Sequence, residues 1–130
     1  MKNFLVILLV CLMTSASAIA DEVASVSASE LNAADYSEWL ILDVRSAEEF
    51  ADGHVPGAMN IGHTELAGRL ADIREYQNKP VVVYCRSGYR AAKAADILSE
   101  ANFSDVLHLE GDIMAWKESN LPLEKPDVKP

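Results

Sequence analysis

The sequence predicts a three-layer α/β fold, in which helices cover both faces of a parallel β-sheet. Three apolar segments, residues 39–44, 81–84 and 105–109, lack the polar alternation of a half-exposed strand, which is typical of strands covered on both faces. Stretches with helical periodicity lie between them, and this alternation of strands and helices favours the α/β class. At 130 residues, the chain has the length of one domain.

The expected strands follow from local composition. Residues 81–84 (VVVY) are the strongest candidate, because they are β-branched or aromatic and follow Pro80. Residues 39–44 (WLILDV) and 105–109 (DVLHL) are short apolar runs of the same kind. Two weaker strands are expected near residues 24–26 and 59–61.

The expected helices are marked by caps and by apolar spacing. Ser29 is expected to cap a helix that ends near Ala34. Ser46 and Glu49 have the spacing of a capping box at the start of the next helix. Three further helices are expected over residues 65–76, 89–101 and 113–119. The helix over residues 89–101 is rich in alanine, which would let it lie close to the sheet.

Residues 1–20 have the layout of a secretory signal peptide. Lys2 precedes an apolar run of ten residues, 4–13, which is too short for the about 20 residues of a bilayer-spanning helix. Small residues follow, and cleavage is expected after Ala20 or after Ala18. The sequence therefore predicts an exported protein, which would be periplasmic in a Gram-negative bacterium.

Removal of residues 1–20 would leave a domain over residues 21–123 and a proline-rich tail over residues 124–130. It would also leave Cys85 as the single cysteine. In an oxidising compartment this thiol has no internal partner, so it is either buried and inert or present for its chemistry.

The composition excludes several classes of function. The chain has 20 acidic and 11 basic residues and a net charge of −9, which disfavours a nucleic-acid partner. His63 and His108 have no cysteine or second histidine at ligand spacing, so no metal and no cofactor is expected. After cleavage we expect no membrane partner, and no element in the sequence favours an oligomer over a monomer.

The segment that carries chemistry is Cys85 to Arg90 (CRSGYR), between the strongest strand and the alanine-rich helix. Sites in α/β sheets form at the carboxyl ends of strands, where this loop is expected to lie. The start of a helix presents unpaired N–H groups and a positive dipole end, and both stabilise a thiolate and bind anions. Arg86 and Arg90 add positive charge, and Gly88 accepts the positive φ of a tight loop. The segment thus predicts an activated cysteine nucleophile.

Cys85 to Arg90 resembles the active-site loop of the rhodanese family of sulfurtransferases. Residues 43–61, which include DVRSAEEF and GHVPGAMNI, resemble the first signature of that family. Residues 109–116 (LEGDIMAW), followed by Leu121 and Pro122, resemble its closing signature. The resemblance covers about residues 27–123, nearly the whole chain after the expected cleavage.

The resemblance implies a five-stranded parallel sheet and a persulfide mechanism at Cys85. A small anionic sulfur donor such as thiosulfate would give its outer sulfur to Cys85, and a thiophilic acceptor such as cyanide would remove it. Arg86, Arg90 and the loop N–H groups would hold the anion. Ser87 and Gly88 would form part of the active-site loop. Tyr89 and Arg86 are expected to shape the mouth of the pocket. By the resemblance, Asp43 and Arg45 would support the loop from behind.

The chain departs from the family pattern at two positions. Ala91 stands where the family often has Ser or Thr, and Asp112 stands where a second glycine commonly follows Gly111. Neither residue is expected to touch the nucleophile.

Two other functions remain open. One is a sulfur carrier or partner-binding module with little turnover. The other is a cysteine-dependent phosphatase or arsenate reductase, whose related loops place five residues between Cys and Arg. Here four residues separate Cys85 from Arg90, which favours a tighter loop that matches one terminal sulfur.

Overall fold

The computed structural model describes residues 23–126, so the predicted signal peptide lies outside the described residues. The described chain forms one five-stranded sheet with the order β1-β5-β4-β2-β3, in which every pair of strands is parallel. The predicted α/β class and the five-stranded sheet are confirmed. The strands are β1 (Ala24–Val26), β2 (Leu40–Asp43), β3 (Met59–Asn60), β4 (Val81–Tyr84) and β5 (Val106–Leu109). The α-helices are α1 (Ala28–Ala33), α2 (Ala47–Asp52), α3 (Tyr89–Glu100) and α4 (Asp112–Glu118).

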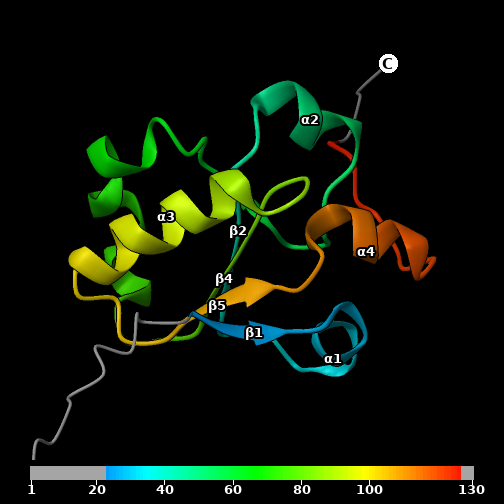
Figure 1. Cartoon of the computed structure of the whole chain (residues 1–130), viewed down its shortest axis with the longest axis horizontal. Helices are drawn as coiled ribbons and strands as arrows, with labels where there is room; N and C mark the ends of the chain where they lie inside the picture. The colour runs from blue at the N-terminus through cyan, green and yellow to red at the C-terminus, as the bar shows by residue number, and fades with distance from the viewer. Residues whose placement is uncertain (1–22, 127–130) are drawn as a thin grey trace, which may run out of the picture.

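Helices cover both faces of the sheet (Figure 1). Side chains alternate between the faces along each strand, so neighbouring residues of β4 enter different cores. Val81 and Val83 pack with the alanine face of α3, whereas Val82 and Tyr84 pack with α1 and α4. The small side chains of α3 on the buried face are Ala91, Ala94 and Ala95.

The carboxyl ends of the central strands β2, β4 and β5 lie at one edge of the sheet. The loops that leave them lead into α2, α3 and α4 respectively, as Figure 1 shows. Because the strands are parallel, these three loops are brought together although 41 residues separate Asp43 from Tyr84.

The first helix begins two residues earlier than the sequence analysis predicted. Its N-cap is Ser27 rather than Ser29. The Glu30 N–H donates to Ser27 Oγ at 3.1 Å, and the Ser27 N–H donates to Glu30 Oε1 at 3.4 Å. This is a capping box, and its spacing is present in the sequence at residues 27–30. The capping box predicted at Ser46 and Glu49 is confirmed.

The prediction of a single amphipathic helix over residues 65–76 is wrong. The structure has two 3₁₀-helices there, η1 (Leu66–Gly68) and η2 (Leu70–Tyr76). Arg69 between them has φ −123° and ψ 17°, which is outside the helical region. Glycine at position 68 disfavours a continuous helix. The apolar spacing still holds, because Leu66 and Ile73 are buried against the same core.

The segment after α4 returns along the molecule and pairs with the loop after α2. His54 and Glu124 exchange two backbone hydrogen bonds of 2.9 Å. The indole N–H of buried Trp116 donates to the Pro122 carbonyl at 2.7 Å. The tail predicted from residue 124 is therefore held to the domain at its first residue.

Candidate active site

Cys85 follows β4 directly and lies at the carboxyl edge of the sheet. Its side chain is 1% exposed, and the Gly88 N–H donates to Cys85 Sγ at 3.0 Å. Gly88 has φ +117°, a conformation that side chains rarely adopt. This backbone turns the chain so that an N–H group faces the sulfur just before α3 begins.

The loop meets the start of the longest helix. Gly88 is the N-cap of α3 and offers no side-chain cap. The N–H groups of the first turn are therefore not satisfied by a cap, and the positive end of the helix dipole lies next to the sulfur. An N–H group and a positive dipole end in these positions are the features that favour a negatively charged sulfur.

The other loop side chains lie on the outside. Arg86, Ser87 and Tyr89 are exposed, and Tyr89 is 71% exposed. Lys93 Nζ lies 4.8 Å from the centre of the Tyr89 ring. Of the two residues predicted at the pocket mouth, Arg86 lines the cleft beside the loop, whereas Tyr89 is not among the residues that line it.

Arg90 is turned toward α2. Its two terminal nitrogens donate to Glu49 Oε1 at 2.6 Å and Glu49 Oε2 at 2.9 Å. The hydrogen bonds from Arg90 lower the pKa of Glu49 to about 2, so this carboxylate stays charged. The same bonds raise the pKa of Arg90, to which Cys85 also contributes. Sequence reasoning missed the role of Glu49, which it treated only as a helix-start charge.

Asp43 and Arg45 form a buried ion pair behind the loop. Arg45 Nη2 donates to Asp43 Oδ2 at 2.6 Å and to the Gly53 carbonyl at 2.9 Å. The Tyr84 hydroxyl donates to Asp43 Oδ2 at 2.7 Å and accepts the Val55 N–H at 3.1 Å. Burial raises the pKa of Tyr84, and the Asp43 charge raises it further. This network joins the strand before Cys85 to the loop after α2.

Asp112 contacts the nucleophile, contrary to expectation. Its Oδ1 accepts the Cys85 backbone N–H at 2.9 Å, and the Ile113 N–H donates to the Cys85 carbonyl at 3.1 Å. His108 Nε2 lies 3.0 Å from both carboxylate oxygens. The sequence carried one signal for this contact, which is the aspartate in place of the second glycine. What it could not show is that the start of α4 lies under the Cys85 loop.

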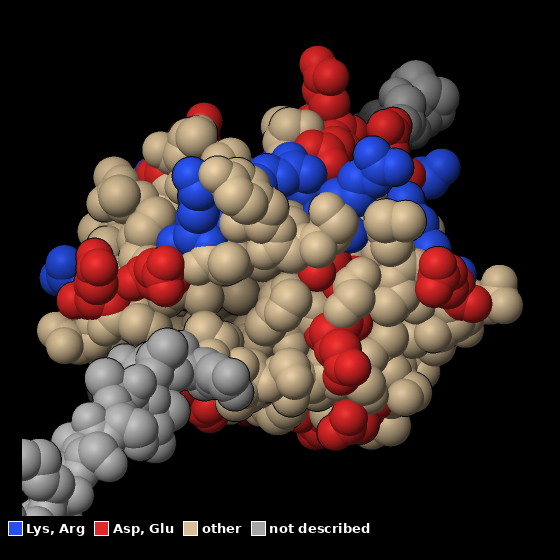
Figure 2. Space-filling view, in the orientation of Figure 1, with Lys and Arg blue, Asp and Glu red and all other residues tan. Residues whose placement is uncertain are grey.

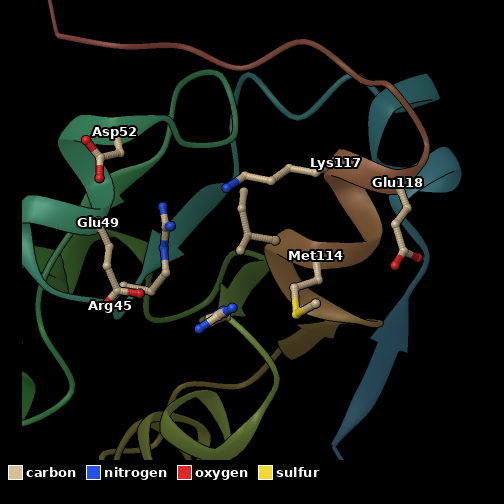
Figure 3. Close-up of a pocket in the computed structure, with 8 residues that line it drawn as sticks. Arg45, Glu49, Asp52, Met114, Lys117 and Glu118 are labelled. Carbon is tan, nitrogen blue, oxygen red and sulfur yellow. The ribbon is translucent and has the colours of Figure 1, made fainter.

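An open cleft of about 460 Å³ lies beside the loop, between α2 and α4. Figure 3 shows Arg45 beneath α2 and Lys117 extending from α4 into the hollow, with Met114 on the same wall. Figure 2 shows that Lys and Arg side chains gather in this region of the surface, with acidic groups around them. The cleft is thus lined by equal numbers of basic and acidic side chains, three of each, in a protein that is acidic overall. Its remaining lining residues are Glu49, Asp52, Arg86, Ile113 and Glu118.

His54 has a structural role in the loop after α2. Its Nδ1 lies 2.9 Å from the Phe50 carbonyl, and its ring stacks on Phe50 with 3.6 Å between ring centres. Within residues 23–126, no three metal-binding side chains lie together. In the same part of the chain, no helix combines the length and the apolar character that crossing a membrane requires.

Comparisons with known proteins agree with this geometry. The chain is 34% identical over 94 residues to a sulfurtransferase of Allochromatium vinosum, which covers 72% of this chain and 86% of the relative. It is 36% identical over 80 residues to the thiosulfate sulfurtransferase GlpE of Shewanella oneidensis, which covers 62% of this chain and 77% of the relative. The crystal structure of a rhodanese-related protein from Thermoplasma volcanium matches with a TM-score of 0.68 and 27% identity, over 78% of this chain and 97% of that one.

The matched region contains every residue of the site described above. Residues 27–119 match the Rhodanese-like domain family, from the cap of α1 to the end of α4. The chain therefore belongs to the rhodanese-like domain family.

Proposed function

We propose that this protein transfers a sulfane sulfur from thiosulfate, or a similar anionic donor, to a thiophilic acceptor through a persulfide on Cys85. The observation that carries the proposal is the Gly88 N–H, 3.0 Å from Cys85 Sγ at the start of α3. A donor in this position favours a sulfur that carries negative charge, both as a thiolate and as a persulfide. The sulfurtransferase names of two relatives support the reaction class.

The reaction consists of two displacements. The Cys85 thiolate attacks the outer sulfur of thiosulfate, so a Cys85 sulfur–sulfur bond forms and the bond to the sulfonate sulfur breaks. Sulfite leaves with the electron pair of that bond. The acceptor, cyanide in an assay, then attacks the outer persulfide sulfur and leaves as thiocyanate, which returns the thiolate. Each half-reaction is complete before the next begins, as in a ping-pong cycle.

The surrounding cations would serve the anionic donor in different ways. Arg86 and Lys117 line the cleft beside the loop and are placed to attract an anion. Arg90 is bound to Glu49, so much of its charge is neutralised and its larger contribution is to hold the loop. We therefore assign donor binding mainly to Arg86, Lys117 and the loop N–H groups.

Lys117 offers a direct test of donor binding. Exchange of Lys117 for alanine is expected to raise the KM for thiosulfate by about fivefold, which corresponds to a charge interaction of about 1 kcal/mol. Steady-state kinetics with thiosulfate and cyanide measure this effect. Lys79→Ala is the matched control, because Lys79 pairs with Glu38 and precedes β4 at the opposite edge of the sheet. An equal rise in KM for both variants would contradict the assignment.

Mass spectrometry tests the persulfide itself. Incubation with thiosulfate is expected to add one sulfur to the peptide that contains Cys85, and cyanide is expected to remove it with release of thiocyanate. Cys85→Ser is expected to take up no sulfur and to show no turnover. Absence of sulfur on Cys85 would contradict the proposal. A persulfide that forms but resists cyanide would instead indicate the sulfur-carrier function.

We further propose that the protein works after export, in the periplasm of a Gram-negative source. The support is the charged, apolar and small-residue order of residues 1–20. Purification of the protein from its native compartment, followed by intact mass measurement, is expected to show a chain that begins at Asp21, after cleavage behind Ala20, or at Ile19, after cleavage behind Ala18. A chain that keeps Met1 would contradict export by cleavage.

A further inference from the structure

Asp112 has two features that the sulfur-transfer mechanism does not use. Its side chain is only 1% exposed, although it carries a carboxylate. Its backbone has φ +56°, in the left-handed region. This conformation costs an ordinary residue about 1–2 kcal/mol and costs glycine almost nothing. A buried charge at a strained position indicates that the side chain is held there by specific contacts.

The contacts of Asp112 all lead to the Cys85 loop or to His108. Asp112 Oδ1 accepts the Cys85 N–H at 2.9 Å, and both oxygens lie 3.0 Å from His108 Nε2. A Cβ atom built on Gly88 would lie 3.4 Å from Asp112 Oδ2 and 3.9 Å from the His108 ring. Gly88 is also the residue whose N–H faces the sulfur. The carboxylate and the sulfur thus both lie close to the same glycine.

The charge of Asp112 creates a difficulty for the thiol. An uncompensated carboxylate next to a thiol opposes formation of the thiolate and repels an anionic donor. A protonated His108 at 3.0 Å removes this difficulty, because the pair then has no net charge. We propose that Asp112 and His108 form a positioning pair that holds the Cys85 backbone and keeps the charge beneath the thiol balanced. This inference rests on the sulfur transfer proposed above.

The surroundings of His108 favour its protonated form. The hydrogen bond to Asp112 raises the pKa of His108, and Glu110 adds to this, while burial acts in the opposite direction. β1 pairs with β5 on one side of His108 through Ala24, Ser25 and Val26, none of which titrates.

The other neighbours of β5 are β4, its loop, α3 and α4. Among the charged side chains of α4, Asp112 is the partner of His108, and Lys117 and Glu118 line the cleft with Arg86. The loop brings the Cys85 thiol, and β4 places Val83 next to His108 in register. Among the charged side chains of α3, Arg90 is bound to Glu49 and Lys93 lies over the Tyr89 ring. The remaining two, Asp96 and Glu100, line a hollow with Val23 and Ala24 near the amino ends of β1 and β5.

Alkylation of Cys85 by iodoacetamide tests the pair without any sulfur donor. The rate is measured against pH on the full chain, and the modified Cys85 peptide is counted by mass spectrometry so that Cys11 does not contribute. His108→Gln leaves the Asp112 carboxylate uncompensated. In mildly acid solution, we expect this variant to react about tenfold more slowly than the parent protein. A factor of about ten is the effect of a nearby charge that shifts a titration by about one pH unit. The difference is expected to shrink as the pH rises and the parent protein loses its His108 proton.

A second variant separates charge balance from packing. His108→Gln combined with Asp112→Asn removes both charges, while the amide oxygen can still accept the Cys85 N–H. We expect this double variant to recover most of the lost alkylation rate. Asp105→Asn is the control for loss of a carboxylate, because Asp105 is exposed before β5.

Two outcomes would overturn the inference. One is a His108→Gln rate equal to that of the parent protein at every pH. The other is a double variant as slow as His108→Gln, since that would assign the loss to packing alone. The sulfur-transfer proposal fails separately, if the parent protein shows the expected alkylation profile but takes up no sulfur from thiosulfate.

Discussion

Gly88 combines two requirements in one residue of the active-site loop. Its φ of +117° sets the turn, and its N–H lies 3.0 Å from Cys85 Sγ. Only glycine meets the first requirement without strain, and any side chain there would also contact Asp112. The left-handed turn and the N–H contact with the sulfur are therefore inseparable at this position.

Gly88→Ala is expected to reduce both stability and sulfur transfer. The strained backbone should lower the free energy of unfolding by about 1–3 kcal/mol. A shifted N–H should lower kcat by about tenfold or more, since each tenfold is about 1.4 kcal/mol of lost transition-state stabilisation. Urea unfolding and the thiosulfate–cyanide assay measure the two effects. Gly68→Ala is the matched control, because a Cβ there meets nothing within 4 Å. Equal behaviour of the two variants would contradict this account.

Tyr84 shows how a core residue supports the site from below. Its hydroxyl joins Asp43 Oδ2 to the Val55 N–H inside the core. Tyr84→Phe leaves that buried N–H without an acceptor, which should lower the free energy of unfolding by about 1–3 kcal/mol. Urea unfolding measures the change. Tyr89→Phe removes an exposed hydroxyl and should change stability by less than about 0.5 kcal/mol. A Tyr84→Phe protein as stable as its parent would show that the hydroxyl contributes nothing net.

At the scale of elements, Arg90 and Glu49 join α3 to α2 across the top of the sheet. The two helices are far apart in the sequence, because α2 follows β2 and α3 follows β4 (Figure 1). The pair is half-buried, so it both fixes the approach of the helices and remains open to water. The contribution of this ion pair to the free energy of unfolding should therefore change with pH in acid solution.

Glu49 titrates at a lower pH in the folded protein than in the unfolded chain. Arg90 lowers its pKa from 4.5 to about 2, so the ionised carboxylate stabilises the fold above pH 4.5. This stabilisation is lost as the pH falls from 4.5 through 2. Glu49→Gln should flatten the pH dependence of the unfolding free energy in that window. Because Glu49 is about a third exposed, the loss at neutral pH should be about 1 kcal/mol or less.

The control for the acid prediction lies on the same helix. Glu48 directly precedes Glu49 and is exposed. The free energy of unfolding of Glu48→Gln should therefore depend on pH as that of the parent protein does. The measurement is urea unfolding at several values between pH 2 and pH 6. If Glu49→Gln and the parent protein gave parallel curves, the ion pair would not stabilise the fold.

The elements could be predicted from sequence where the local signal is strong. The runs 81–84 and 39–44 gave β4 and β2 to within one residue at each end, because uninterrupted apolar β-branched runs specify buried strands. The region 65–76 failed, because apolar spacing near 3.6 is shared by an α-helix and by two shorter 3₁₀ turns. There the conformation of Arg69 separates the two 3₁₀-helices, and the signal beside it, Gly68, disfavours a continuous helix without specifying the 3₁₀ form.

The candidate site was predictable for the loop but not for its neighbours. Cys85, Gly88 and Arg90 lie in one short motif, so their proximity is given by the chain itself. Glu49 and Asp112 come from other elements, and only the order of strands in the sheet brings them to the loop. Contacts of this kind depend on the tertiary arrangement, which a single sequence does not contain.

At the scale of the whole molecule, the chain closes on itself around the active-site edge. The segment after α4 pairs with His54 through Glu124, and Leu123 lies against Gly53. The Gly53 carbonyl accepts a hydrogen bond from Arg45, which lines the cleft. The last described residues are therefore linked to the site through one loop.

Removal of residues 121–130 should weaken both the fold and the site. It deletes the two backbone hydrogen bonds of 2.9 Å with His54 and the acceptor of the Trp116 indole N–H. These three bonds, with a buried indole left unpaired, correspond to about 2–4 kcal/mol of unfolding free energy. The Gly57 N–H also loses its acceptor, Glu124 Oε2 at 3.2 Å. Removal of residues 125–130 keeps all three bonds and is the matched control. Urea unfolding of both truncated chains measures the difference in unfolding free energy. The thiosulfate–cyanide assay shows whether loosening of the loop after α2 also disturbs Arg45 and lowers the activity. A shorter chain as stable as the control would show that the returning segment does not hold the domain together.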